Sequence, residues 1–148
     1  MEDARSIAQD FLDRQGEATI AGDVEATVGW CDIPCTLESF RGKIVATTEA
    51  EIRAICATFI DSLKAKRLTH MMRRCLEAVY NDDDTICATY ETRYIQDGHQ
   101  LTEEPSVGFV ILRRSGDRWK ISNIQFAVGN DSPVDVTLRD WMRGRAEN

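Results

Sequence analysis

The strongest constraint on the fold is a change of hydrophobic period at Leu68. From this residue onward, apolar side chains recur at every second position, in four extended runs that cover residues 68–80, 85–96, 106–114 and 118–128. Turn-forming segments at residues 81–84, 97–98 and 115–117 separate the runs. The pattern predicts four successive strands in an antiparallel meander, and strands of this length must twist and curl.

The residues before Leu68 follow a helical period instead. Apolar side chains from residue 4 to residue 18 share one face, and this pattern breaks at Ala21-Gly22-Asp23. Asp23 can cap a second, short helix over residues 24–30, which Pro34 is expected to close. Two short extended stretches, residues 35–40 and 43–46, follow with a reversal at Arg41-Gly42.

A third helix has the clearest start signal in the chain. The segment from Thr48 to Glu51 forms a capping box, and an apolar stripe follows as far as Leu63. A further short helix is predicted from Ser132 to Gly144. These patterns divide the chain into a main domain over residues 1–130 and a C-terminal extension over residues 131–148.

Composition excludes several classes of protein. A chain of 148 residues suits one compact domain, and a net charge of −7 argues against a nucleic-acid groove or an anionic membrane surface as the main partner. No apolar run approaches the roughly 18 residues that a membrane-spanning helix needs. The 5 cysteines lack Cys-x-x-Cys spacing, only 2 histidines accompany them, and no apolar leader follows Met1. We therefore expect a reducing cytoplasm, no metal site and no cofactor.

Both alternating sets of the predicted strands contain apolar side chains. Ile86, Tyr90 and Tyr94 point one way, while Cys87 and Ile95 point the other. One layer of helices covers only one face of a sheet, so we expect a second copy of the chain to bury the other face in a symmetric homodimer. In this interpretation Tyr90 and Tyr94 belong to the dimer surface.

The order of the predicted elements resembles the SnoaL-like branch of the nuclear-transport-factor-2-like superfamily. Ala21-Gly22-Asp23 at the first helix junction and the segment from Gly116 to Ile121 are similar to recurring features of that group. The resemblance covers roughly residues 4 to 128. It implies an α+β, cone-shaped barrel of the cystatin-like type, in which helices pack on a curved, mainly antiparallel sheet around an apolar pocket. Members include enzymes, ligand-binding proteins and assembly modules.

The resemblance also permits a comparison of catalytic positions. Gln15 corresponds to a first-helix tyrosine of ketosteroid isomerase, and Ser39 to its general-base aspartate, so isomerase chemistry of that type is not matched. His70 corresponds to a catalytic histidine of scytalone dehydratase. Ile20 and Ile95 stand where that enzyme has an orienting acid and a second pocket histidine.

Strand pairing predicts which side chains meet. If Tyr80 faces Thr85 across the hairpin, His70 lies opposite Ile95, and the pairs Met72/Arg93 and Arg74/Glu91 share its face. If that face lines the cone, the predicted pocket combines one candidate catalytic histidine with amides, a charge pair and apolar walls. Its predicted members are Gln15, His70, Met72, Arg74, Glu91, Arg93, Ile95, Asn123 and Gln125. A shift of the strand register by one residue would exchange the side chains that line the pocket for those on the opposite face.

Three hypotheses follow. The first is a homodimeric protein that binds a small, largely apolar organic ligand. The second is a cofactor-independent lyase or isomerase in which His70 acts as acid and base. The third is a noncatalytic assembly subunit like the small subunits of ring-hydroxylating dioxygenases. An open pocket would favour the first two, and a cone filled by side chains the third.

Overall fold

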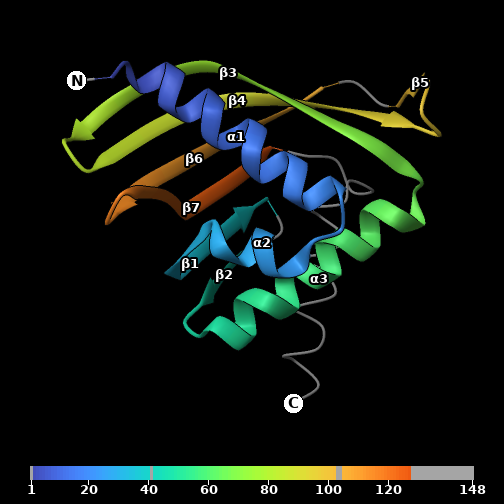
Figure 1. The fold of residues 1–148 in the computed structure, drawn as a ribbon, viewed down its shortest axis with the longest axis horizontal. Helices are drawn as coiled ribbons and strands as arrows, with labels where there is room; N and C mark the ends of the chain where they lie inside the picture. The colour runs from blue at the N-terminus through green and yellow to red at the C-terminus, as the bar shows by residue number, and fades with distance from the viewer. Residues whose placement is uncertain (1, 41, 103–104, 128–148) are drawn as a thin grey trace.

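A computed structural model describes residues 2–40, 42–102 and 105–127 of the chain. Three helices pack on one face of a curved, mainly antiparallel sheet (Figure 1), which confirms the predicted fold class. The sheet order is β2-β1-β7-β6-β4-β3, and β5 pairs with β4. The elements are α1 (Ala4–Ile20), α2 (Val24–Gly29), β1 (Cys31–Ser39), β2 (Gly42–Ala46), α3 (Glu49–Ala65), β3 (Leu68–Asp82), β4 (Thr85–Gln96), β5 (Gln100–Leu101), β6 (Ser106–Ser115) and β7 (Arg118–Ala127).

The predicted helix caps are confirmed. The Asp23 side chain accepts a hydrogen bond from the Ala26 amide at 3.0 Å, which starts α2. The Thr48 hydroxyl accepts one from the Glu51 amide at 3.1 Å, which starts α3. The Glu51 carboxylate reaches back and accepts from the amide of Thr47, one residue before the cap, at 3.1 Å. The helix predicted from Ser132 to Gly144, and the extension that contains it, lie outside the described residues.

One element boundary was predicted wrongly. Pro34 does not close a helix: α2 ends at Gly29, and Pro34 lies within β1, which already begins at Cys31. Strand β1 runs parallel to β7, and its register shifts between Cys31 and Thr36. Proline lacks an amide proton, so it is tolerated in a strand where the regular ladder is interrupted.

The predicted pairing of the long hairpin is confirmed along its centre. His70 pairs with Ile95, Met72 with Arg93 and Arg74 with Glu91, while β4, β6 and β7 continue the antiparallel meander. The assumed pairing at the turn was wrong, because Thr85 pairs with Asp82 rather than Tyr80. Register shifts in β3 between residues 75 and 77 and between residues 80 and 82 account for the difference.

Helix α1 is fastened to the outermost strand of the sheet, β3. The Gln9 side chain donates to the Arg73 carbonyl and accepts from the Cys75 amide, both at 2.8 Å. The Arg5 guanidinium donates to the Cys75 carbonyl at 3.1 Å. These bonds satisfy backbone groups that an edge strand would otherwise leave open. They also fix the helix over the inner face of β3 (Figure 1).

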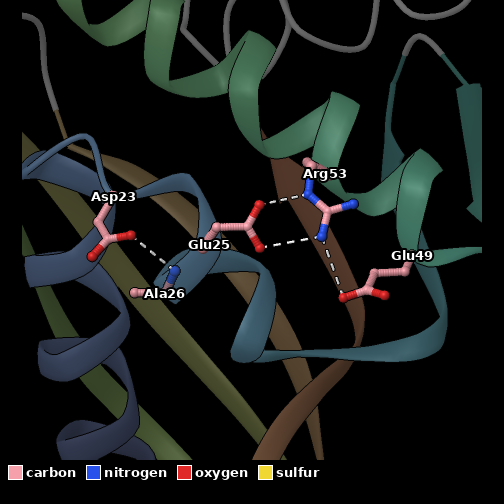
Figure 2. Close-up of polar contacts among 5 residues, drawn as sticks. All are labelled: Asp23, Glu25, Ala26, Glu49 and Arg53. Carbon is pink, nitrogen blue, oxygen red and sulfur yellow. Dashed lines mark hydrogen bonds and ion pairs between the residues drawn. The ribbon is translucent and has the colours of Figure 1, made fainter.

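A charged cluster joins the other two helices (Figure 2). Arg53 on α3 donates from Nε to one Glu25 oxygen at 2.6 Å and from Nη2 to the other at 3.1 Å. Its Nη2 also reaches Glu49 at 3.4 Å. The hydrogen bond from Arg53 lowers the pKa of Glu25 below its ordinary value. The contact orients α2 against α3 on the exposed surface of the helical layer.

Among the described residues, no helix is both long enough and apolar enough to cross a membrane.

Candidate functional site

A cavity of about 100 Å³ lies between the helices and the inner face of the sheet. Most of its wall is apolar, and every helix contributes to it, together with β1, β3, β4 and β7. Its described lining residues are Gln15, Thr27, Cys31, Cys35, Leu37, Ile52, Ile55, Cys56, Phe59, Met71, Arg73, Tyr90, Thr92, Tyr94, Ile121, Ile124 and Phe126. The cone is therefore not completely filled by its own side chains.

Arg73 is the only charged side chain among the described residues that line the cavity. Its Nη2 donates to two neutral acceptors on α1, the Leu12 carbonyl and the Gln15 side-chain oxygen. Asp13 lies near enough for its charge to act on Arg73 but forms no ion pair with it among the described contacts, and the buried Nε has no hydrogen-bond partner. Burial lowers the pKa of Arg73 below its ordinary value, because the charged form is desolvated.

Two tyrosines of β4 lie beside this guanidinium. The Arg73 Cζ atom is 5.9 Å from the centre of the Tyr90 ring. Tyr90 is 1% exposed, and its hydroxyl has no hydrogen-bond partner among the described residues. Burial raises the pKa of Tyr90 to about 12, and it also raises the pKa of Tyr94. Both phenols are thus neutral at ordinary pH and able to donate hydrogen bonds.

Two glycines make room for these polar groups. A Cβ atom on Gly108 of β6 would lie 2.6 Å from Cζ of the Tyr90 ring, so only glycine allows the ring its position. A Cβ atom on Gly16 of α1 would lie 3.2 Å from Nη2 of Arg73. The close approach of backbone to side chain is the physical reason for glycine at each place.

Three thiols line the same cavity. Cys31 and Cys35 come from β1 and Cys56 from α3, and all three are free. The Cys31 thiol donates to the Thr27 carbonyl at 3.6 Å, and hydrogen bonds from Cys35 and Cys56 lower the pKa of Cys31 below its ordinary value. The same contacts, together with burial, raise the pKa of Cys35 and Cys56. No group of three or more cysteine, histidine or acidic residues is arranged to hold a metal ion within the described part of the chain.

Only one of the sequence-predicted pocket residues, Gln15, lines this cavity. The pairs built on His70, Met72 and Arg74 form as predicted, but they lie on the outer face of the sheet. His70 is exposed, Met72 is 46% exposed, and Arg74 forms an ion pair with Glu91 at 3.3 Å. The face assignment was therefore wrong: Met71, Arg73, Tyr90 and Tyr94 face inward, and the tyrosines do not belong to the outer surface. A catalytic role for His70 stays a prediction, and it would have to operate outside the cavity.

Asn123 and Gln125 are displaced from the cavity for a different reason. Ile121 faces the core, but the register of β6 and β7 shifts before Asn123, so Ile111 pairs with Asn123 and Leu112 with Ile121. This irregularity adds one residue, Ser122, to β7, so the side chains that follow it point to the opposite face of the sheet from the one that alternation predicts. Ile124 and Phe126 consequently line the cavity where simple alternation would have placed the two amides.

The missed residues carried one usable signal. In β4, the set that contains Tyr90, Thr92 and Tyr94 has no charged member, whereas the alternate set contains Glu91 and Arg93. Because isolated charges avoid the interior of a protein, this difference favours the tyrosine face as the inner one. Arg73 is a charged residue on the inner face, so the rule that charges avoid the interior could not identify it as a cavity residue.

Neither the protein-family models nor the curated proteins contain a match to this chain. Solved structures do match it. A domain of unknown function with a cystatin-like fold from Nostoc punctiforme superposes with a TM-score of 0.66 at 12% identity, over 98% of each chain. A nuclear-transport-factor-2-like protein of unknown function from Shewanella oneidensis gives 0.66 at 14% identity, over 83% of this chain and 98% of that one.

A third solved structure also matches the chain. A ketosteroid isomerase-like protein from Erwinia carotovora atroseptica superposes with a TM-score of 0.63 at 14% identity, over 86% of this chain and 97% of that one. At these identities the likeness concerns the fold. The chain thus has a nuclear-transport-factor-2-like, cystatin-like fold, and its function has to be argued from its own site.

Proposed function

We propose that the protein binds a small, largely apolar organic ligand in the cavity between its helices and its sheet. The observation that carries this proposal is an apolar wall interrupted by a few convergent polar groups, Arg73, Tyr90 and Tyr94. Binding sites for small molecules have this composition, because apolar area supplies affinity and a few polar groups supply orientation. The cavity of about 100 Å³ suits a ligand with a short chain or a single ring.

The lyase or isomerase hypothesis receives less support. His70 lies on the exposed outer face, where its Nδ1 contacts the neighbouring Thr69 hydroxyl at 2.9 Å. The cavity offers phenols and a guanidinium, which can polarise a carbonyl but are poor bases near neutral pH. We therefore place binding before catalysis.

We also propose that a second copy of the chain covers the outer face of the sheet. Met72, Val79 and Val107 are 46%, 55% and 44% exposed, and their side chains lie on the outer face of β3 and β6. Exposed apolar side chains on a sheet face that no described helix covers favour a protein partner. The same surface would serve an assembly subunit, in which case its partner would be a different chain.

The binding proposal is tested by blocking the cavity. Ile55→Phe adds volume to the wall, and Ile95→Phe makes the same change on the outer face as a matched control. A panel of short-chain and single-ring acids, ketones and alcohols is screened by thermal shift and isothermal titration calorimetry. We expect at least one compound to bind wild type and Ile95→Phe but not Ile55→Phe. Equal binding to both variants would contradict the proposal, provided that circular dichroism shows both folded.

A further inference from the structure

The cavity contains a positive charge with no ion-pair partner among the described residues. Arg73 Nη2 bonds only to neutral acceptors, and the charge of Asp13 acts on the guanidinium without a direct contact. A buried charge without a counter-charge is costly, so folded proteins normally pair such groups. This cost is explained if the counter-charge arrives with a ligand.

Two hydrogen-bond donors at this place are also unused. Arg73 Nε and the Tyr90 hydroxyl are both shielded from solvent and both lack a partner among the described residues. Tyr90 is 1% exposed, and both side chains line the same cavity. Leaving buried polar groups unsatisfied destabilises a fold, and such groups in a native structure point to something that completes them.

The geometry points to a carboxylate as the group that completes this site: the ligand is a small organic acid whose carboxylate binds Arg73 Nε and the Tyr90 hydroxyl. This inference rests on the proposed function and names its ligand class. One carboxylate oxygen accepts from the Nε–H group and the other from the phenol. The apolar part of the acid then packs against the aliphatic wall formed by residues such as Ile55 and Ile124.

A phosphate fits this donor set less well than a carboxylate. Arg73 Nη2 already donates to Leu12 and Gln15, so the guanidinium cannot offer its paired Nε and Nη2 donors to a ligand. Phosphate carries more charge and more acceptor oxygens than a carboxylate, and one guanidinium with one phenol satisfies it less completely. A short aliphatic or single-ring acid is the matching class.

Neighbouring residues hold the guanidinium in place for this role. Gln15 accepts from Nη2, and Gly16 lets α1 approach that nitrogen closely, because any side chain there would begin 3.2 Å from it. Gln9 bonds to the carbonyl of Arg73 and to the amide of Cys75, so the backbone next to the guanidinium is also fixed to α1. Binding of the acid therefore needs little rearrangement, which favours affinity.

The test compares acids with their neutral amides. Hexanoate and benzoate are titrated against hexanamide and benzamide by isothermal titration calorimetry near neutral pH, with wild type, Arg73→Met and Arg74→Met. Arg74 is the matched control, because it is the next residue in the chain but lies on the outer face. We expect an acid to bind wild type and Arg74→Met at least about tenfold more tightly than its amide, and Arg73→Met to abolish that preference.

The outcomes separate the two proposals. If acid and amide bind wild type equally and Ile55→Phe still blocks both, the carboxylate inference is wrong and the proposed function stands. If none of the four compounds binds wild type and the wider panel binds no better, both are wrong. Should Arg73→Met fail to fold, Tyr90→Phe provides the second variant, and it is expected to weaken binding of the acid more than that of the amide. An unchanged preference in Tyr90→Phe would overturn the two-donor geometry.

Discussion

The guanidinium of Arg73 faces the ring of Tyr90, with Cζ 5.9 Å from the ring centre, and each side chain keeps one buried polar atom without a described partner. This pair lies inside a cavity whose described wall is otherwise uncharged. Buried polar groups without partners destabilise a core that serves structure alone. Here such groups lie together at a cavity in which a small molecule has room to bind. Substitutions at and around the pair can separate a functional role from a structural one.

The first prediction concerns the stability of the empty protein. Arg73→Met removes a desolvated charge and fills the same space with an apolar chain, so we expect the free energy of unfolding to rise by about 1 kcal/mol. Urea unfolding measures this change. Arg74→Met, on the exposed face, should alter it by less than about 0.5 kcal/mol. A loss of stability in Arg73→Met would show that the arginine supports the fold instead.

The second prediction concerns the glycine beneath Tyr90. Gly108→Ala places a Cβ atom 2.6 Å from the Tyr90 ring, and we expect it to destabilise the protein by about 1 to 3 kcal/mol. Chemical denaturation gives the value. In a Tyr90→Leu background the same change should cost much less, because the obstructing ring is gone. Gly29→Ala, whose Cβ comes no closer than 3.6 Å to Arg118, is the tolerated control.

The third prediction is a loss of stability at alkaline pH. Burial raises the pKa of Tyr90 from 10.0 to about 12, so the folded protein holds this proton after the unfolded chain has released it. The stability that the raised pKa of Tyr90 contributes is fully present below pH 10 and is lost as pH rises toward about 12. Between these values the unfolding free energy of wild type should fall relative to that of Tyr90→Phe by about 1.4 kcal/mol per pH unit. Urea titrations from pH 9 to pH 11 measure it, and a constant difference would contradict the burial of this phenol.

The fourth prediction concerns the thiols. Because hydrogen bonds from Cys35 and Cys56 lower the pKa of Cys31, this cysteine should react before the other two thiols with a small alkylating reagent. Peptide mass spectrometry after labelling at pH 6 identifies the site. Cys35 and Cys56, whose pKa is raised, should remain unmodified. Initial labelling at either of them would show that the cluster is arranged differently.

The fifth prediction concerns the outer face. If a second copy covers it, Val79→Arg should convert a dimer into a monomer, because Val79 is 55% exposed on that face. Analytical ultracentrifugation at micromolar concentration reports the change. Val45→Arg, at a partly exposed residue of β2, is the control that should leave the dimer intact. A wild-type monomer would exclude the arrangement.

Local signals predicted the fold well. The change of period at Leu68, the caps at Asp23 and Thr48 and the pairing of His70 with Ile95 all follow from short-range rules, and the structure confirms them. These rules concern neighbours along the chain or across one hairpin, where steric and hydrogen-bonding preferences are strong. The order of elements therefore followed from the residues alone.

The site was harder to predict because it depends on which face of the sheet the helices cover. The pairing of β3 and β4 is the same whichever face is inside. A correct register therefore did not decide whether the face of His70 or the face of Arg73 lines the cavity. The register shift at Ser122 then exchanged faces within β7, which alternation cannot show. Arg73 itself breaks the rule that charges lie outside, as functional residues often do.

The central claim, that the inner cavity is the binding site and Arg73 its anchor, is tested most directly by a crystal structure grown with benzoate. We expect the carboxylate inside the cavity, within hydrogen-bonding distance of Arg73 Nε and the Tyr90 hydroxyl, with the ring against Ile55 and Ile124. Benzoate bound instead to Arg74, Arg93 or His70 on the outer face, beside an empty cavity, would contradict it.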